Sequence, residues 1–164
     1  MSDVTSPTPI MRNRENGEQR WFHGGGLHTW LAREEETGGA YFLFEDQMAG
    51  GKVTPLHTHP VDESLYVVEG EIVIHMDGQE TAIRSGGLVI APRWVPHAFM
   101  VVSEFARVLT LHTPGGCQAF YLGASEAVSD DHPASGVVDF DKVMASAKEN
   151  GGIEILGPPP FAKP

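Results

Sequence analysis

Four side chains in two nearby segments have the types and the spacing of metal ligands. One residue separates His57 from His59, Glu63 follows four positions later, and His97 lies in a separate segment. Alternate residues of a strand point to the same face, so His57 and His59 can aim their imidazoles at one point. Glu63 would add a carboxylate, and His97 would return from another strand. Three imidazoles and one carboxylate suit iron, manganese, nickel, cobalt, copper or zinc and leave coordination positions open. The spacing therefore predicts one divalent transition metal ion.

Turn residues flank both segments. Gly51 and Gly70 bracket the first segment, and Gly86 and Pro92 precede His97 in the second. Glycine and proline at these positions indicate tight turns, which would place the ligand residues near the ends of strands. The other interpretation is that these histidines are surface or cap residues between strands. The combination of ligand spacing and flanking turns favours the metal site.

Short β-type runs separated by turn residues dominate the chain from residue 20 to about residue 123, which predicts an all-β sandwich or barrel. Asp77-Gly78 between two such runs predicts a tight hairpin, because both residues tolerate positive φ. The expected strands are residues 21–23, 27–32, 40–44, 63–68, 71–76, 80–84, 88–91, 97–102, 105–112 and 118–122.

The chain divides by composition into three parts. Residues 1–18 are polar and lack periodicity, which predicts a flexible N-terminal arm. Residues 19–123 form the expected barrel. Residues 124–164 form a C-terminal extension with a helix at about 139–149, whose apolar residues recur at helical spacing. Asp139 can cap the start of this helix, and Asn150-Gly151 can end it.

Charge and cysteine content narrow the possible partners and compartments. The chain of 164 residues has a formal net charge of -11, which disfavours nucleic acid and anionic membrane surfaces as partners. Cys117 is the only cysteine, so no intrachain disulfide can form. The N-terminus lacks the apolar region of a signal peptide, and no run reaches the length of a membrane span. We therefore expect a cytoplasmic protein.

The two ligand segments resemble the paired motifs of the cupins over residues 41–122. Within that superfamily, the single-domain layout, Thr113-Pro114-Gly115-Gly116 and the extension ending in residues 155–159 resemble monocupin proteins of the quercetin 2,3-dioxygenase type. The resemblance implies a double-stranded β-helix, or jelly-roll barrel, with one C-terminal α-helix. It also implies flavonols such as quercetin as substrates. Two residues depart from the family pattern: Trp94 replaces the usual glycine and Val101 the usual asparagine.

These departures concern the expected pocket and not the metal ligands. If His97 points inward, Phe99 and Val101 share its face of the strand, which predicts an apolar wall suited to an aromatic guest. Ordinary core packing is the alternative for Val101. Trp94 lies beside the ligands in sequence and can line the mouth of the pocket. His112 is the remaining pocket candidate.

The favoured function is a metal-dependent dioxygenase that acts on an aromatic or enolisable small molecule, with dioxygen as co-substrate. Glu63 is the expected catalytic residue, because a carboxylate beside a metal can accept a proton from a substrate hydroxyl. Isomerisation, decarboxylation or cyclisation on the same metal is the enzymatic alternative. A non-catalytic sensor or binding module is the alternative from another class. A spare apolar edge strand and the family habit both suggest a homodimer.

Overall fold

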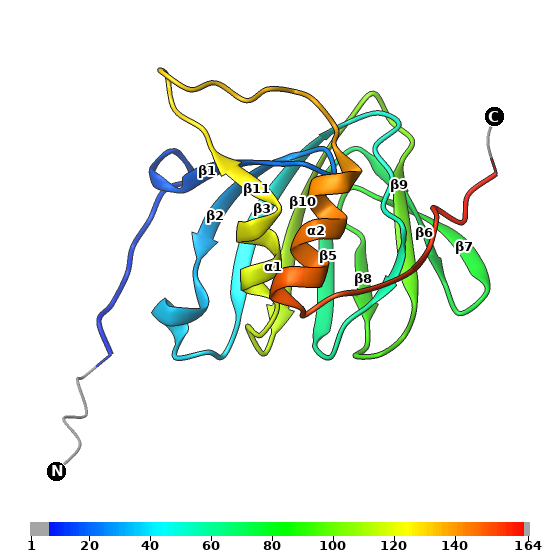
Figure 1. Cartoon of the computed structure of the whole chain (residues 1–164), viewed down its shortest axis with the longest axis horizontal. Coiled ribbons are helices and arrows are strands. Elements are labelled where there is room, and N and C mark those ends of the chain that lie inside the picture. Colours follow the sequence, from blue (N-terminus) through cyan, green and yellow to red (C-terminus); the bar gives the residue numbers. More distant parts are fainter. Residues whose placement is uncertain (1–6, 163–164) are drawn as a thin grey trace, which may run out of the picture.

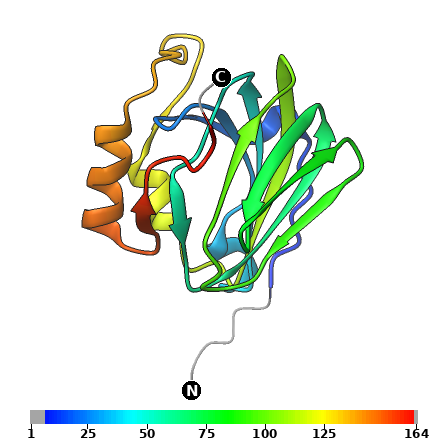
Figure 2. The ribbon, with the colours of Figure 1, turned by 90° about the vertical axis from the view of Figure 1, so that its right-hand side faces the viewer.

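The protein, described over residues 7–162 by a computed structural model, consists mainly of two antiparallel β-sheets that face each other (Figures 1 and 2). The seven-stranded sheet has the order β11-β1-β2-β3-β10-β5-β8 and the five-stranded sheet the order β12-β4-β9-β6-β7. In sheet order, the first comprises β11 (Ser125–Ala127), β1 (Glu18–Phe22), β2 (Leu27–Ala32), β3 (Phe42–Ala49), β10 (Phe105–Thr113), β5 (Asp62–Glu69) and β8 (Leu88–Ala91). The second comprises β12 (Glu154–Gly157), β4 (Leu56–Thr58), β9 (His97–Val101), β6 (Glu71–Met76) and β7 (Gln79–Arg84).

The mostly β fold expected from the sequence is confirmed. The predicted bounds of β2, β6 and β8 agree with the observed ones. The hairpin between β6 and β7 turns at Asp77 and Gly78, whose φ angles are 54° and 70°. Positive φ at both central residues is the geometry that a tight two-residue hairpin requires.

The prediction of a strand at residues 118–122 is wrong, because Gln118–Gly123 forms the short helix α1. A run of six residues is too short for periodicity to separate a strand from a buried helix. Phe120 and Tyr121 are both buried and both line one cavity, although neighbouring residues of a strand would point to opposite faces. The Gln118 side chain also accepts a hydrogen bond from the backbone N–H of Glu34 at 2.8 Å. Tertiary packing therefore favours a helix over a strand for this segment.

The C-terminal extension is built into the barrel. Its helix α2 (Phe140–Asn150) begins and ends as predicted, and the Asp139 carboxylate accepts a hydrogen bond from the Lys142 backbone at 3.4 Å. The helix packs on α1, where the Ser146 hydroxyl donates to the Phe120 carbonyl at 2.8 Å. The extension also contributes β11 to one sheet and β12 to the other. Figure 2 shows α2 on the outside, with the following segment returning to β4.

The predicted N-terminal arm lies partly outside the described residues, which begin at residue 7. From there to β1 the chain is exposed and forms only the 3₁₀ turn η1 (Arg14–Asn16). Arg12 nevertheless donates to the Leu31 carbonyl at 2.7 Å, and Arg14 lies 2.7 Å from the Glu45 carboxylate. These contacts attach residues 12–14 to the outside of the seven-stranded sheet. A second 3₁₀ turn, η2 (Glu34–Thr37), follows β2.

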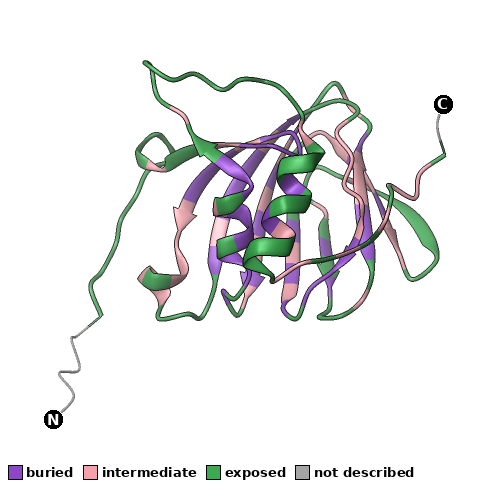
Figure 3. Cartoon of the chain, in the orientation of Figure 1, coloured by how far each residue is buried: buried purple, intermediate pink, exposed green. Residues whose placement is uncertain are grey.

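The buried residues, purple in Figure 3, lie mainly on strands of the two sheets and on the helices, and they form two hydrophobic clusters. The aliphatic cluster comprises Met48, Leu65, Val67, Ile72, Ile74, Val89, Val101, Ala106 and Val108. The aromatic cluster comprises Phe22, Trp30, Phe42, Phe44, Val61, Cys117, Phe120, Tyr121, Ala124 and Val143. Both sheets contribute residues to the aliphatic cluster, whereas α1 and α2 supply part of the aromatic one. The candidate site lies beside the aromatic cluster.

Candidate metal centre and its cavity

The predicted ligands come together from both sheets. His57 on β4 pairs in register with His97 on β9, so these two residues come from the five-stranded sheet. Glu63 on β5 pairs in register with His112 on β10, which places these two on the seven-stranded sheet. His59 follows the end of β4 and lies between them. All five residues are buried, and we call them the histidine cluster.

Backbone carbonyls fix the orientation of the three predicted imidazole ligands. The Nδ1 atoms of His57, His59 and His97 each lie 2.8 Å from a main-chain oxygen two residues away in sequence. A carbonyl accepts only, so each Nδ1 must carry the proton and donate it. Each neutral ring then presents the lone pair of Nε2. This is the tautomer that a histidine needs to bind a metal through Nε2.

The free nitrogen atoms face a carboxylate. The Nε2 atoms of His97 and His59 lie 3.3 and 3.6 Å from the Glu63 oxygens. Neither Nε2 has a hydrogen-bond partner among the described residues. A nitrogen lone pair and a carboxylate oxygen repel each other unless a cation lies between them, and burial makes unpaired acceptors costly. The donor set therefore fits a bound metal ion.

Two overlapping groups in the histidine cluster can each surround one ion. His57, His59 and His97 form the first group, and His59, Glu63 and His112 form the second. In each group the candidate ligand atoms lie within 4.8 Å of one another. His59 belongs to both groups, so a single ion near His59 can reach residues from either. The cluster is thus consistent with a metal site.

The protonation states of His57 and Glu63 suit metal binding. Burial lowers the pKa of His57 to about 3, and the neighbouring His97 adds to this effect. Burial alone would raise the pKa of Glu63, but His112, His59 and His97 outweigh it and hold that pKa well below its ordinary value. Near neutral pH, His57 is therefore neutral and Glu63 is ionised, which are the forms that bind metal.

His112 has a different place from the one predicted. It was expected in the substrate pocket, but it is fully buried behind Glu63 and donates a hydrogen bond from Nε2 to the carboxylate. Its ring stacks on Phe42 at 4.6 Å between centroids, and the Tyr121 hydroxyl lies 3.5 Å from the same Nε2. Burial lowers the pKa of His112, although Glu63 opposes the shift. His112 therefore positions the carboxylate of Glu63.

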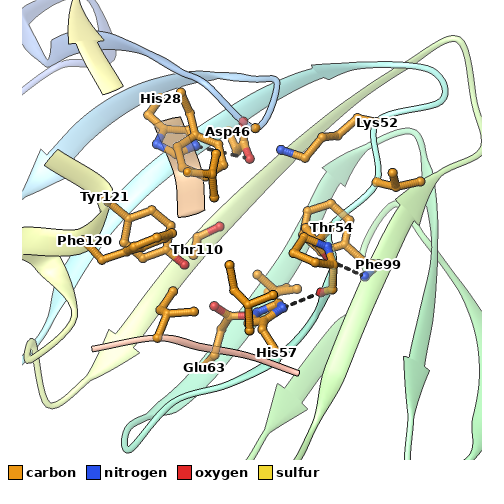
Figure 4. A pocket seen from close by; sticks show the side chains of 18 of the residues that line it. His28, Asp46, Lys52, Thr54, His57, Glu63, Phe99, Thr110, Phe120 and Tyr121 are labelled. Carbon is orange, nitrogen blue, oxygen red and sulfur yellow. Dashed lines mark hydrogen bonds and ion pairs between the residues drawn. The ribbon is translucent and has the colours of Figure 1, made fainter. Parts of the chain in front are cut away.

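A cavity opens beside the histidine cluster and contains about 60 Å³ of space, which is room for a few water molecules. His57 and Glu63 lie at one end of it, and Phe99 forms part of the wall (Figure 4). Aromatic rings supply much of the remaining lining, in particular those of Phe22, Phe44, Phe120, Tyr121 and Phe140. Val143, Ile153 and Ile155 from the C-terminal extension cover it. A flavonol would fit only if this cover moved.

Trp94 and Val101 do not line this cavity. Val101 shares its strand face with Phe99 as expected, but it lies one step further along β9 and packs into the aliphatic cluster opposite Ile72. The Trp94 ring is 60% exposed. Its backbone donates to the His59 carbonyl at 2.9 Å, and its φ is 68°, so the main chain of Trp94 contacts the site and the ring does not.

Two charged residues and one histidine in the cavity were not predicted as site residues. His28 on β2, Asp46 on β3 and Lys52 in the following loop all line it, at the far end from Glu63 (Figure 4). One sequence signal could have found Asp46, because it lies between Phe44 and Met48 at alternating positions of a strand. A carboxylate among inward-facing apolar residues is unusual and marks a candidate functional site.

The chain also resembles known proteins. Residues 44–112 match the family described as "Cupin domain". Quercetin 2,3-dioxygenase of Bacillus subtilis (strain 168) is 26% identical over 109 residues, which cover 65% of this chain and 32% of that protein. The chain thus aligns with about a third of the dioxygenase. The comparison identifies a distant relative.

Two solved structures share the fold. The polyketide cyclase RemF from Streptomyces resistomycificus is 21% identical with a TM-score of 0.56. The superposition covers 65% of this chain and 80% of the RemF chain. A predicted oxalate decarboxylase from Thermotoga maritima is 18% identical with a TM-score of 0.58. The superposition covers 64% of this chain and 99% of the decarboxylase chain. At these identities the likeness concerns the fold alone. The family match identifies residues 44–112 as a cupin domain.

Proposed function

We propose that this cupin domain protein is a metal-dependent dioxygenase that acts on a hydroxylated aromatic or enolisable small molecule. One observation carries the proposal: three buried imidazoles, each held through Nδ1 by a backbone carbonyl, surround a carboxylate at the end of a cavity lined by aromatic rings. The distant similarity to quercetin 2,3-dioxygenase supports an oxidative reaction.

His57, His59, Glu63 and His97 would hold one divalent transition metal ion. A bound ion of this kind supplies Lewis acidity and, if redox-active, a route for electrons to dioxygen. The protein's own contribution begins with Glu63, whose ionised carboxylate would take the proton from a substrate hydroxyl that a bound ion makes more acidic. His112 holds the carboxylate in place, since it donates to one of its oxygens. The deprotonated substrate is electron-rich enough to react with dioxygen.

The aromatic walls perform two further tasks. Phe44, Phe120 and Tyr121 offer flat apolar surfaces that orient an aromatic ring and exclude bulk water from the reacting end. The cover formed by Val143 and Ile155 acts in the same way from the other side. The small volume of the cavity favours compact substrates, or larger ones that displace this cover.

Non-oxidative metal chemistry is the second candidate, because proteins described as a polyketide cyclase and a predicted oxalate decarboxylase share the fold. An isomerase, decarboxylase or cyclase would use the same Lewis acid and the same base. Oxygen uptake with a panel of phenols separates the two. We expect consumption of oxygen with at least one phenol when the protein contains iron, manganese, nickel, cobalt or copper. No consumption with any of these metals would favour the non-oxidative reaction, and binding without turnover would favour a sensor.

The metal site has its own test. His57→Ala combined with His59→Ala should leave the circular dichroism spectrum unchanged but remove most of the metal found by elemental analysis. His132→Ala changes an exposed histidine and serves as the control. A double variant that retains a full equivalent of metal would refute this ligand set.

We also propose a cytoplasmic homodimer that takes a small-molecule substrate and binds neither nucleic acid nor membrane. The net charge of -11 supports the last point, and no helix in residues 7–162 is long and apolar enough to cross a membrane. Tyr66, Leu88 and Ile90 support the dimer, because they are exposed apolar residues on the edge strand β8 and its neighbour. Light scattering should give twice the mass of one chain, and Ile90→Lys should lower it.

A further inference from the structure

At the end of the cavity away from the histidine cluster, two side chains have polar atoms without a hydrogen-bond partner in residues 7–162. Asp46 is 5% exposed, and its Oδ1 makes no hydrogen bond within the described part of the chain. His28 is 1% exposed, and its Nδ1 is likewise unpaired there. Buried polar groups are almost always paired, so unpaired atoms on residues that line a cavity point to a missing ligand. Both residues line the cavity.

Neighbouring groups hold these side chains in place. The His28 ring stacks between Phe44 at 4.0 Å and Phe22 at 4.9 Å, and its Nε2 lies 3.5 Å from the other Asp46 oxygen. His28 and Asp46 also pair in register across β2 and β3. The Lys52 ammonium donates to the Gly25 carbonyl, and it lies over the Phe22 ring at 5.0 Å. Figure 4 shows this ammonium pointing toward Asp46. The three side chains are therefore preorganised, with hydrogen-bonding capacity to spare.

Strand register places this group well away from the metal ligands. Glu63 pairs with His112, which pairs with Phe42, whereas Asp46 lies four residues further along β3. Four residues of a strand span about 13 Å. Phe44 lies on the same face between the two levels. A ligand that reaches from one end of the cavity to the other would place its apolar middle against this aromatic section.

The charges indicate what this end would bind. An anionic group on a ligand would meet the carboxylate of Asp46, and a cationic group would meet the ammonium of Lys52. A neutral hydroxyl suits both, because it donates to Asp46 Oδ1 and accepts from Lys52 Nζ. We propose that His28, Asp46 and Lys52 form a second recognition site, which binds a hydroxyl at the far end of an aromatic substrate whose other hydroxyl reacts at the histidine cluster. The identity of the reacting end rests on the proposed function.

The test compares ligands that differ in one distant hydroxyl. Zinc-loaded protein is titrated by calorimetry with three pairs of increasing length, because zinc does not oxidise the ligands. The pairs are phenol and hydroquinone, 2-naphthol and 2,6-dihydroxynaphthalene, and 3-hydroxyflavone and 3,4′-dihydroxyflavone. In at least one pair the second hydroxyl should tighten binding by about tenfold or more, as expected for hydrogen bonds to charged groups.

Two variants assign that gain to the proposed residues. Lys52→Met removes the donor and Asp46→Asn removes the charged acceptor, and each should reduce the advantage of the dihydroxy compound to about threefold or less. Binding of the monohydroxy compound should not change. Glu45→Gln is the matched control, because Glu45 is a buried carboxylate on the same strand that faces Arg14 and Arg107 instead of the cavity. This variant should keep the full advantage.

The outcomes separate this proposal from the proposed function. If monohydroxy compounds bind and the second hydroxyl adds nothing in any pair, the second recognition site is refuted and the phenolic substrate class stands. If none of the six compounds binds, both are refuted.

Unfolding temperatures supply a readout that needs no ligand or metal. Recognition residues are retained for binding, so Lys52→Met and Asp46→Asn should leave the midpoint within about 2 °C of the wild type or raise it. A fall of more than about 4 °C in both variants would show that they stabilise the fold, and would overturn the assignment.

Discussion

The aliphatic cluster and the aromatic cluster are packed differently. The aliphatic cluster consists mainly of residues such as Ile72 and Val67, which are fully buried and have apolar side chains. The aromatic cluster lies beside a cavity, into which charged and imidazole side chains project. Strand residues of the two sheets fill the first region. Helices and short terminal strands complete the second.

This difference separates stability from function within one barrel. Branched aliphatic side chains interdigitate at high density and leave no room for a ligand. The large aromatic rings come from distant parts of the chain, and a space remains between them. Several polar atoms around this space have no hydrogen-bond partner among the described residues. The four predictions below test this division, starting with the largest expected effect.

Glu63→Gln should affect chemistry far more than stability. Glutamine keeps the size and one ligating oxygen, but it removes the negative charge and nearly all basicity. Turnover per bound metal should fall by roughly 10²–10⁴ if Glu63 is the general base, while metal affinity falls less. Oxygen uptake normalised to metal content measures this, with the exposed Glu80→Gln as control. A fully loaded variant with wild-type turnover would make Glu63 only a ligand.

Ile72→Ala should affect stability and leave metal binding intact. Ile72 has no exposed surface and packs against Val101 in the aliphatic cluster. Loss of a buried aliphatic side chain leaves a cavity, so the free energy of unfolding should fall by about 2–5 kcal/mol. Urea denaturation measures it, and the half-exposed Val102→Ala provides the comparison. A cost below about 1 kcal/mol would contradict close packing in this half.

Acid should destabilise the metal-free protein through the histidine cluster. Burial lowers the pKa of His57 to about 3 and also lowers that of His112, so the unfolded chain binds more protons than the native one below about pH 6.5. Keeping these two histidines neutral costs no stability above that pH. As the pH falls toward their pKa values in the native state, the free energy of unfolding decreases. His97 opposes this, because its interaction with Glu63 outweighs burial and raises its pKa.

Two histidines have a lowered pKa and one has a raised pKa, so the free energy of unfolding should decrease from about pH 7.5 to about pH 5. The decrease should be at most about 1.4 kcal/mol per pH unit for each proton taken up on unfolding. Urea titrations of chelator-treated protein at several pH values measure the slope. His57→Gln removes the largest contribution and should flatten it. A stability that rises on acidification would mean that these imidazoles are charged in the native state.

Trp94→Gly should give a small gain. Trp94 has φ of 68°, a left-handed conformation that costs a residue with a side chain about 1–2 kcal/mol, and its ring is largely exposed. Glycine removes this strain but adds freedom to the unfolded chain, so the net gain should be about 0.5–1 kcal/mol. Thermal unfolding measures it. Trp94→Ala retains the Cβ and should show no gain. A less stable glycine variant would indicate that the indole packs in solution.

Much of this protein could be predicted from local sequence. The alternation and turn residues around β2, β6 and β8 predict strands with the observed bounds, because a strand with one buried face has a period of two. Asp77-Gly78 predicts its hairpin and Asp139 its helix start, since both depend on the backbone preferences of neighbouring residues. His57, His59 and Glu63 lie close in sequence, so their spacing alone was enough to bring them together.

Other features depend on strand register and packing over long distances. His112 lies behind Glu63 because β10 pairs with β5, and His28 lies beside Asp46 because β2 pairs with β3. Phe120 and Tyr121 lie in a helix, which allows both side chains to line the cavity from one side. Short-range pattern was enough to predict the fold class and to indicate His57, His59 and Glu63 as candidate ligands. Only the tertiary structure decided which polar side chains share the cavity, because residues far apart in sequence leave no local trace of their pairing.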